Sequence, residues 1–389
     1  MAEASPSPLE FPDSPVARIM HQPLLLGLFL PIQSGGWSPS SLPRSTSWEF
    51  DYNARLTQRA EALGFDLAFG LAQWMGKGGT GGAIRFREQS LDPFITATSL
   101  AVITERIVLI STIHVLYGPW HPVYLAKLGA TVDHISGGRW GLNVVTGFVP
   151  SEARMFGNDQ IEHDQRYAMA DEFTELMKML WASQENLSRE GRYWRLIDAF
   201  VTPRPRFGRP LLVNATGSPA GITYAAKHSD LVFITSPGGG HVDAAIAALP
   251  RHNAEIKAKA KECGRTVRTI INPMIICRAT EQEARDYYDA IVAAADVEAI
   301  EGFLGRRASG DAKGWKTDLG AYRAVGGNMQ IVGSPTQVVE RFAQLKEAGC
   351  DGVQLTFFDF AQDLEFFGAE VVPLMRRAGL RNQVGAQLR

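Results

Sequence analysis

The residues best suited to chemistry in this 389-residue chain are polar side chains set inside apolar runs. Asn143 lies in the run Trp140–Thr146, directly after the glycine-rich turn Ser136–Arg139. A buried amide costs free energy unless it is hydrogen-bonded. An apolar strand that carries one therefore indicates a partner for it, either within the fold or in a ligand.

Thr112 has a similar place near the end of an earlier apolar run, Ile107–His114. If the two runs are neighbouring barrel strands, Thr112 and Asn143 meet at the catalytic mouth. Together they offer a hydroxyl donor, amide donors and an acceptor. Purely structural pairing between strands is the alternative. His114 is a further candidate because it ends a strand.

A second candidate site lies in Leu211–Gly221, where a strand ends and small residues lead into a helix. Pro219 is typical of the first helical turn. Free backbone N–H groups and the helix dipole suit a phosphate there, and Thr216 and Ser218 can add hydroxyl donors. The same pattern is equally typical of an ordinary N-cap, so the residues alone leave both readings open.

The other sequence motifs give little information about function. Gly76–Gly81 formally matches GxGxxG, but it does not join a strand to a helix, so it predicts a flexible loop. The histidines are not spaced as metal ligands, and no GxSxG elbow marks a nucleophilic serine. The sequence thus offers neither a protein nucleophile nor a metal site.

Composition narrows the class of protein. The chain is 45% hydrophobic and 21% charged, with a formal net charge of −2, as in a folded protein with a large core. No basic block indicates nucleic acid, and the longest apolar stretch, Leu24–Ile32, is too short to cross a membrane. Three separated cysteines without a CxxC favour a reducing, cytoplasmic location. Residues 1–20 lack the features of a signal peptide and predict a flexible or loosely docked arm.

Short apolar runs alternate with longer helical patterns. The expected strands, dense in apolar residues as in strands buried on both faces, are Leu24–Leu30, Phe65–Phe69, Ile107–His114, Trp140–Thr146, Leu211–Ala215, Leu231–Thr235, Met274–Cys277 and Val353–Phe357. The expected helices are Asp51–Leu63, Pro93–Thr104, Val123–His134, Asp164–Trp181, Pro219–Lys227, Val242–Cys263, Glu281–Ala294, Thr336–Ala348 and Asp363–Ala378.

This alternation predicts an α/β fold, a (β/α)8 TIM barrel, over residues 21–389 as a single domain. The uneven spacing predicts insertions near 72–91, 183–209 and 295–330. The second of these reads as a short hairpin closed by prolines, and 303–320 reads as a mobile loop. A doubly wound sheet with a second domain is the structural alternative.

The tract from Arg139 to Tyr167 carries a specific resemblance. Ser-Gly-Gly-Arg-Trp-Gly-Leu-Asn-Val-Val-Thr-Gly-Phe (136–148), Glu152 and Glu-His-Asp-Gln-Arg-Tyr (162–167) resemble the bacterial-luciferase-like flavin monooxygenases. Within that family the chain is most similar to the dimethylsulfone monooxygenases and the pyrimidine oxygenases. The resemblance extends over most of the chain, to the closing Val371-Val372-Pro373-Leu374-Met375.

The resemblance implies a luciferase-like barrel that takes reduced FMN from a separate NAD(P)H:flavin reductase and uses O2 to oxygenate a small molecule. Thr112 and Asn143 would sit at the reactive edge of the flavin. In the pyrimidine-oxygenase branch, the matching pair holds O2 where a flavin N5-peroxide forms. The other residues that match flavin contacts are Ala72, Gln73, Glu152, Arg166, Tyr167, Gly217 and Ser218, and the match at Ser218 favours the phosphate reading. The family also implies a homodimer or homotetramer.

The resemblance defines the substrate less closely than the cofactor. We expect C–S or C–N bond cleavage, with His114, Trp120, Phe148 and Phe357 as candidate substrate contacts. Ala72-Gln73 is smaller and less basic than the pyrimidine-oxygenase counterpart, and Phe148 replaces a Trp common in both relatives. Two alternatives keep the fold: a flavin-degrading lyase, or an oxygenase of a larger heteroaromatic or chlorinated compound. A third alternative is a non-catalytic flavin-binding protein, and the matches at Glu152 and Arg166-Tyr167 weigh against a deazaflavin-dependent dehydrogenase.

Overall fold

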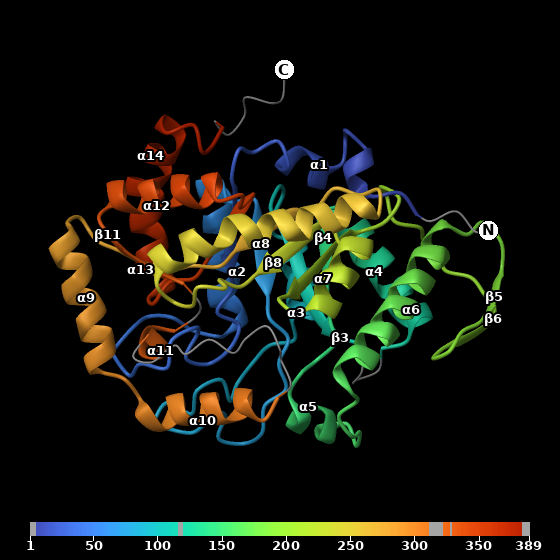
Figure 1. The fold of residues 1–389 in the computed structure, drawn as a ribbon, viewed down its shortest axis with the longest axis horizontal. Helices are drawn as coiled ribbons and strands as arrows, with labels where there is room; N and C mark the ends of the chain where they lie inside the picture. Colours follow the sequence, from blue (N-terminus) through green and yellow to red (C-terminus); the bar gives the residue numbers. More distant parts are fainter. Residues whose placement is uncertain (1–4, 116–119, 311–321, 327–328, 383–389) are drawn as a thin grey trace.

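The computed structural model describes residues 5–115, 120–310, 322–326 and 329–382. Eight parallel strands close into a barrel in the order β1-β12-β9-β8-β7-β4-β3-β2, and helices surround it (Figure 1). The strands are β1 (Leu25–Phe29), β2 (Leu67–Gly70), β3 (Val108–His114), β4 (Trp140–Val145), β7 (Leu211–Thr216), β8 (Leu231–Ile234), β9 (Arg268–Ile271) and β12 (Gly352–Leu355). The predicted (β/α)8 barrel is therefore confirmed.

The strands are largely apolar and almost entirely buried, because helices cover them outside and packed side chains fill them inside. The helices that follow the strands are α2 (Phe50–Leu63), α3 (Pro93–Ala101), α4 (Pro122–Ser136), α6 (His163–Ala182), α7 (Pro219–His228), α8 (Val242–Glu262), α12 (Pro335–Glu347) and the closing series α13 (Phe360–Phe366), η2 (Phe367–Val371) and α14 (Val372–Arg377). Gly64 ends α2 with φ at 91°, in the left-handed region that glycine occupies without strain. The chain can thus turn at once into β2.

The seventh barrel strand differs from the prediction. Met274–Cys277, the expected strand, is β10, which pairs with β11 (Gln330–Gly333) in a separate two-stranded sheet. The barrel strand is the preceding β9, whose polar start at Arg268 hides it in the sequence. β10 is as apolar as a barrel strand because α9 (Glu281–Ala293) and α12 pack against it. Composition alone cannot distinguish two adjacent strands that are both buried.

The insertions have different structures. Residues 183–209 contain the expected hairpin, formed by β5 (Leu187–Glu190) and β6 (Arg195–Ala199). Residues 295–330 contain α10 (Val297–Ala308) and α11 (Tyr322–Val325), so the loop expected from 303 is helical as far as residue 308. Residues 311–321 of that loop lie outside the described residues.

The 72–91 segment forms turns, with no regular helix or strand apart from a bridge at Ser90. It packs against the start of α10, where the Thr80 hydroxyl donates to the Ala299 carbonyl at 3.1 Å. The backbone N–H of Ile84 donates to Asp296 at 3.2 Å. These two insertions, together with the short α5 (Pro150–Met155), lie at one end of the barrel, opposite the N-terminal segment (Figure 1). That end is where the strands finish.

We expected a flexible or loosely docked arm at the N-terminus, and its described residues, from Ser5 on, are docked on the barrel domain. It forms η1 (Pro8–Glu10) and α1 (Pro15–Ile19), each begun by a serine N-cap, and it buries Pro8 and Val16. The Ser7 hydroxyl donates to Asp230 at 2.9 Å. Its composition of Pro, Ser and Ala suggested a solvated chain, but proline at a first helical turn and serine at a cap are also ordinary helix starts.

Asp230, directly before β8, is a buried charge that joins the N-terminal segment to the barrel. Arg209 donates to it twice, at 2.6 and 2.7 Å, and both side chains are at most 2% exposed. Burial alone would raise the pKa of Asp230, but Arg209 and Arg265 outweigh burial and lower that pKa to about 2. The carboxylate is therefore charged at neutral pH and depends on its arginines.

Replacing Arg209 with methionine should lower the free energy of unfolding by about 3 kcal/mol, because it leaves Asp230 buried with less compensation. Urea unfolding at pH 7 measures this. The exposed Arg189 of the hairpin is the matched control, and Arg189→Met should change the unfolding free energy by less than about 0.5 kcal/mol. Equal effects of the two substitutions would contradict the assigned role of the pair.

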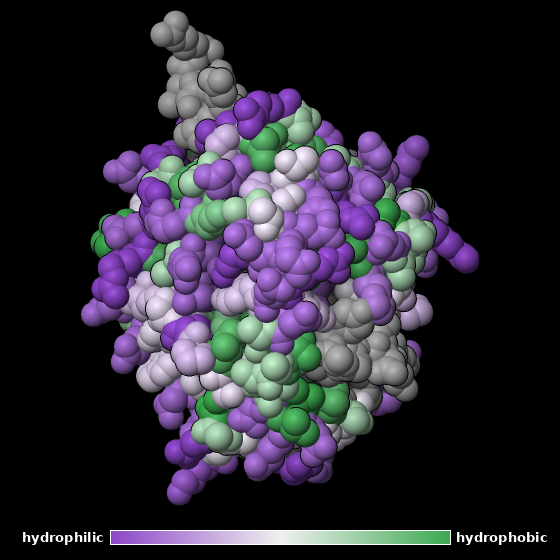
Figure 2. All heavy atoms as spheres, turned by 90° about the vertical axis from the view of Figure 1, so that its left-hand side faces the viewer, coloured by the Kyte–Doolittle hydropathy of each residue, from purple (hydrophilic) through white to green (hydrophobic). Residues whose placement is uncertain are grey.

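The surface is mixed in polarity. Figure 2 shows a face on which polar side chains prevail, with an apolar area in its lower half. Among the described residues, no helix combines the length and the apolar character that crossing a membrane requires.

Candidate functional site

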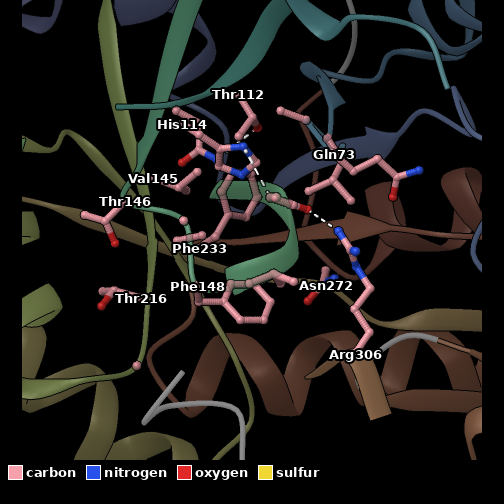
Figure 3. Close-up of a pocket in the computed structure, with 18 of the residues that line it drawn as sticks. Gln73, Thr112, His114, Val145, Thr146, Phe148, Thr216, Phe233, Asn272 and Arg306 are labelled. Atoms are coloured by element: carbon pink, nitrogen blue, oxygen red, sulfur yellow. Dashed lines mark hydrogen bonds and ion pairs between the residues drawn. The ribbon is translucent and has the colours of Figure 1, made fainter. Parts of the chain in front are cut away.

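A cavity of about 270 Å³ opens at the C-terminal ends of the barrel strands. Residues at or just after the ends of β1, β2, β3, β4, β7, β8 and β9 line it, and the insertions at 72–91 and 295–330 complete its wall. This is the face on which barrel enzymes build their active sites, because several loops converge there on a rigid frame. Ten of the residues that line the cavity are labelled in Figure 3.

Thr112 and Asn143 come together as the sequence predicts. The parallel register of β3 and β4 places them directly opposite each other. The Asn143 amide donates to the Thr112 hydroxyl at 3.0 Å, and both side chains are at most 2% exposed. The amide oxygen of Asn143 has no hydrogen-bond partner within the described part of the chain. A buried acceptor left in this state, on the wall of a cavity, is aimed at a ligand or an ordered water.

His114, Glu152 and Arg306 form a connected row of polar side chains on the wall of the cavity. One oxygen of Glu152 lies 3.7 Å from Nδ1 of His114, and the other lies 2.5 Å from Arg306. In Figure 3, dashed lines that start at the labelled His114 and Arg306 mark these two contacts. Burial lowers the pKa of His114; Glu152 opposes that shift and Arg306 adds to it. His114 is therefore a neutral imidazole at pH 7.

Arg306 also ties three segments together. It donates to the Ser151 hydroxyl at 3.0 Å and to the Trp74 carbonyl at 2.8 Å, in addition to Glu152. Through this one side chain, α10 is bonded to α5 and to the 72–91 segment. Sequence reasoning missed Arg306 because it lies in the stretch that was expected to be a loop.

The opposite part of the cavity is built around the start of α7. Ser218 is the N-cap of this helix, and its hydroxyl accepts from the backbone N–H of Gly221 at 3.2 Å. Tyr167, Arg166 and Gly217 line the cavity beside it. A Cβ added at Gly221 would lie 1.8 Å from the Thr216 hydroxyl oxygen and 2.6 Å from that of Tyr167. Only glycine therefore lets the hydroxyl groups of Thr216 and Tyr167, two residues of the cavity wall, keep their positions in this corner.

Aromatic rings form much of the remaining wall. Phe29, Phe69 and Phe233, at the ends of three barrel strands, have ring centroids 4.6 to 5.7 Å apart, and Trp37 lies 4.5 Å from Phe29. Sequence reasoning missed the three phenylalanines. Their shared position at a strand end was the signal that could have found them.

The expected site residues divide into two groups. Those that line the cavity are Thr112, His114, Asn143, Ala72, Gln73, Phe148, Glu152, Arg166, Tyr167, Gly217 and Ser218. Trp120 and Phe357 do not line it. Trp120 packs against Phe94 and Tyr124, and Phe357 is in the core against Phe360 and Phe367. Aromatic character alone did not distinguish core residues from cavity residues.

Comparison with known proteins accounts for this arrangement. A family model described as luciferase-like monooxygenase matches residues 25–352. The chain belongs to this family. It is a flavin-dependent monooxygenase, as the resemblance in the tract from Arg139 to Tyr167 predicted.

Two relatives of known activity match over nearly their whole length. The FMNH2-dependent dimethylsulfone monooxygenase of Pseudomonas putida is 34% identical, over 92% of this chain and 96% of the relative. The pyrimidine monooxygenase RutA of Acinetobacter baylyi is 31% identical, over 90% of this chain and 94% of the relative. A crystal structure of a riboflavin lyase has the same fold, with a TM-score of 0.80, 24% identity and 92% of both chains covered.

The row His114–Glu152–Arg306 predicts that two substitutions shift the pKa of His114 in opposite directions. Glu152→Gln should lower the pKa of His114 further, because Glu152 raises it, whereas Arg306→Met should raise it, because Arg306 lowers it. Titration of the histidine rings by NMR measures both shifts. Glu301→Gln, an exposed position of α10, is the control and should leave the His114 pKa unchanged. Shifts in the same direction in both variants would refute the arrangement.

Proposed function

We propose that the enzyme binds reduced FMN and O2 and transfers one oxygen atom to a small organic substrate, with cleavage of a C–S or C–N bond. The observation that carries the proposal is the Thr112–Asn143 pair, with the buried amide oxygen of Asn143 on the cavity wall. The two relatives act on a sulfone and on pyrimidines, according to their names. Those substrates are the basis for the two bond types.

The strand-end side of the cavity fits the flavin ring. An isoalloxazine presents a row of hydrogen-bonding atoms on one edge and apolar faces, so it needs a few polar contacts in a largely apolar wall. The Asn143 amide oxygen supplies an acceptor, Ala72 is small, and Gln73 is held by a hydrogen bond from its amide to the Arg87 carbonyl at 3.2 Å. Glu152 and its partner Arg306 add a fixed charge pair.

The start of α7 fits the phosphate. The first turn of a helix presents unbonded N–H groups and a positive dipole end, which bind anions. The buried Thr216 hydroxyl, which lines the cavity, has no hydrogen-bond partner within the described residues, and Gly221 packs directly against it. Arg166, which is 1% exposed, supplies a positive charge on the same side. These residues would hold the phosphate of FMN.

The protein's own part in the reaction is to bind, orient and exclude water. Reduced FMN, when bound, supplies the electrons that activate O2. Asn143 and Thr112 hold their donors and acceptor in one fixed geometry because the β3–β4 register sets it. Neutral His114 keeps a polar nitrogen near this pair without adding charge, and the aromatic wall keeps the volume dry.

The same proposal includes the partners. A separate NAD(P)H:flavin reductase supplies the reduced flavin, and the enzyme acts as a homodimer or homotetramer in the cytoplasm. The neighbouring helices α3 and α4 expose three large apolar side chains, Ile95, Tyr124 and Ile135. These side chains support self-association, because such residues are common at protein–protein interfaces.

Asn143→Ala and Thr112→Ala should each reduce oxygenated product at least about 100-fold while the fold persists. The measurement is single-turnover mixing of protein, reduced FMN and ¹⁸O2 with a panel of sulfones and pyrimidines, followed by mass spectrometry. Far-ultraviolet circular dichroism checks the fold.

Thr131→Ala, on the outer face of α4, is the control and should leave product formation at the wild-type level. Wild-type turnover by both site variants would reject the proposed site. A wild-type protein that binds FMN tightly but yields no labelled product with any compound would instead favour a non-catalytic flavin-binding protein.

Gly221→Ala should weaken FMN binding at least about tenfold but change riboflavin binding little, because the added methyl group would displace the Thr216 and Tyr167 hydroxyls in the corner proposed for the phosphate. Equilibrium titration by flavin fluorescence measures both dissociation constants. Thr223→Ala, exposed on the same helix, is the control. An equal loss for FMN and riboflavin would show that this corner does not bind the phosphate.

A further inference from the structure

We propose that His163 binds the phosphate of FMN through its Nε2 atom, so that the first turns of two helices, α6 and α7, hold the phosphate together. The proposal rests on the proposed function, because it adds a residue to the phosphate site described there. The flavin contacts expected from the sequence do not include His163. The ligand chemistry is that of a phosphate monoester, whose three terminal oxygens accept hydrogen bonds from several directions.

His163 is a buried side chain with one ring nitrogen already in use. It is 6% exposed and lines the cavity. Its Nδ1 lies 2.5 Å from Oδ1 of Asp164, and because a carboxylate only accepts, Nδ1 carries the hydrogen of that bond. Within the part of the chain that the structure describes, no hydrogen bond reaches Nε2. A buried ring nitrogen in this state, on a cavity wall, indicates a ligand or an ordered water.

The place of His163 on α6 puts it beside a positive charge. His163 is the first residue of the helix, and Arg166 and Tyr167 follow three and four positions later, which places all three on one face. All three line the cavity. Arg166 is 1% exposed, and the rings of His163 and Tyr167 have centroids 5.2 Å apart. Because the positive end of the helix dipole lies at the same turn, this part of α6 suits an anion.

The carboxylates of this turn have other roles. Glu162 caps the helix, where it accepts from the backbone N–H of Gln165 at 2.9 Å, and Asp164 accepts from His163. Neither Glu162 nor Asp164 lines the cavity. The acidic side chains of this turn therefore do not block an anion in the cavity from reaching Nε2.

The start of α7 meets this turn of α6 at the corner proposed for the phosphate. The two helices pack against each other, and the Tyr167 hydroxyl oxygen lies 2.6 Å from a Cβ added at Gly221, in the first turn of α7. The Thr216 hydroxyl oxygen, buried and without a hydrogen-bond partner among the described residues, lies 1.8 Å from the same added atom. A phosphate in this corner can therefore be bonded from α7 on one side and from α6 on the other.

The contact at Nε2 needs a proton, because an ionised phosphate oxygen only accepts. That proton lies either on the phosphate, as P–OH donating to Nε2, or on Nε2, donating to the oxygen. Nδ1 keeps its own proton toward Asp164 in both cases, so Asp164 holds the ring in one orientation. Riboflavin has no phosphate and cannot make this contact, although it shares the ring and the ribityl chain of FMN.

His163→Phe keeps a flat ring beside Tyr167 but removes both nitrogens. It should weaken the binding of oxidised FMN about tenfold to a hundredfold, as expected for the loss of a hydrogen bond to a charged group, and change riboflavin binding less than about twofold. Titration by flavin fluorescence measures both dissociation constants.

Two further variants make the result specific. His163→Gln places an amide nitrogen near the position of Nε2 and should recover part of the loss for FMN. His21→Phe is the matched control, because His21 is an exposed histidine that precedes β1 at the other end of the barrel. This variant should leave both dissociation constants unchanged.

A measurement on wild-type protein does not depend on the folding of a variant. In ¹⁵N NMR of labelled histidine rings, oxidised FMN should shift the Nε2 signal of one histidine that riboflavin leaves in place. That signal should be missing from the spectrum of His163→Gln.

The outcomes separate the two proposals. An equal loss for both flavins in His163→Phe, an unchanged dissociation constant for FMN, or a wild-type spectrum in which no histidine responds to FMN alone would each overturn the role of His163. Should Gly221→Ala weaken FMN binding alone while His163→Phe does not, the phosphate corner stands without His163. Wild-type protein that binds FMN no more tightly than riboflavin would reject the phosphate corner itself, and the role of His163 with it.

Discussion

The register between β3 and β4 is the constraint on which the site depends. Six consecutive residue pairs, from Leu109 opposite Trp140 to His114 opposite Val145, fix one strand against the other. Side chains alternate between the two faces of a strand, so a shift of one residue would turn Thr112 and Asn143 away from each other or out of the barrel. The Trp140 indole N–H donates to the Ser111 hydroxyl at 3.0 Å on the outer face, which locks the same register from the other side. The geometry of the pair is thus a property of the sheet and not of a loop.

Most of the fold, and the Thr112–Asn143 pair, can be predicted from the sequence because both depend on local patterns. Strands buried on both faces are apolar throughout, and a single Asn or Thr near the end of such a strand stands out. Glycine after a helix, as at Gly64, marks where the next strand begins. The seventh strand failed this reasoning because β9 and β10 are adjacent, both buried and separated by only Asn272-Pro273. Only the closure of the barrel decides which of them belongs to it.

The remaining wall could not be predicted, because it depends on contacts between distant segments. Arg306 lies 154 positions from Glu152, and no short motif connects them. Arg87 has a positive φ that only the surrounding hydrogen bonds, to Ser34 and Gln73, make acceptable. Trp120 and Phe357 were expected at the cavity but pack against other aromatic rings instead. Whether such an aromatic residue lines the cavity depends on neighbours that are far away in sequence.

The two halves of the cavity therefore differ in the elements that form and stabilise them. The half proposed for the flavin is built mainly from barrel strands and from the start of a ten-residue helix, whose positions the closed sheet determines, and the insertions add Ala72, Gln73 and Arg306 to it. The half that remains for the substrate is built largely from the insertions at 72–91 and 295–330, which contact each other through Thr80 and Ala299 and are tied to α5 by Arg306. One barrel can therefore keep the same flavin site while its substrate site differs, because different interactions stabilise the two halves of the cavity.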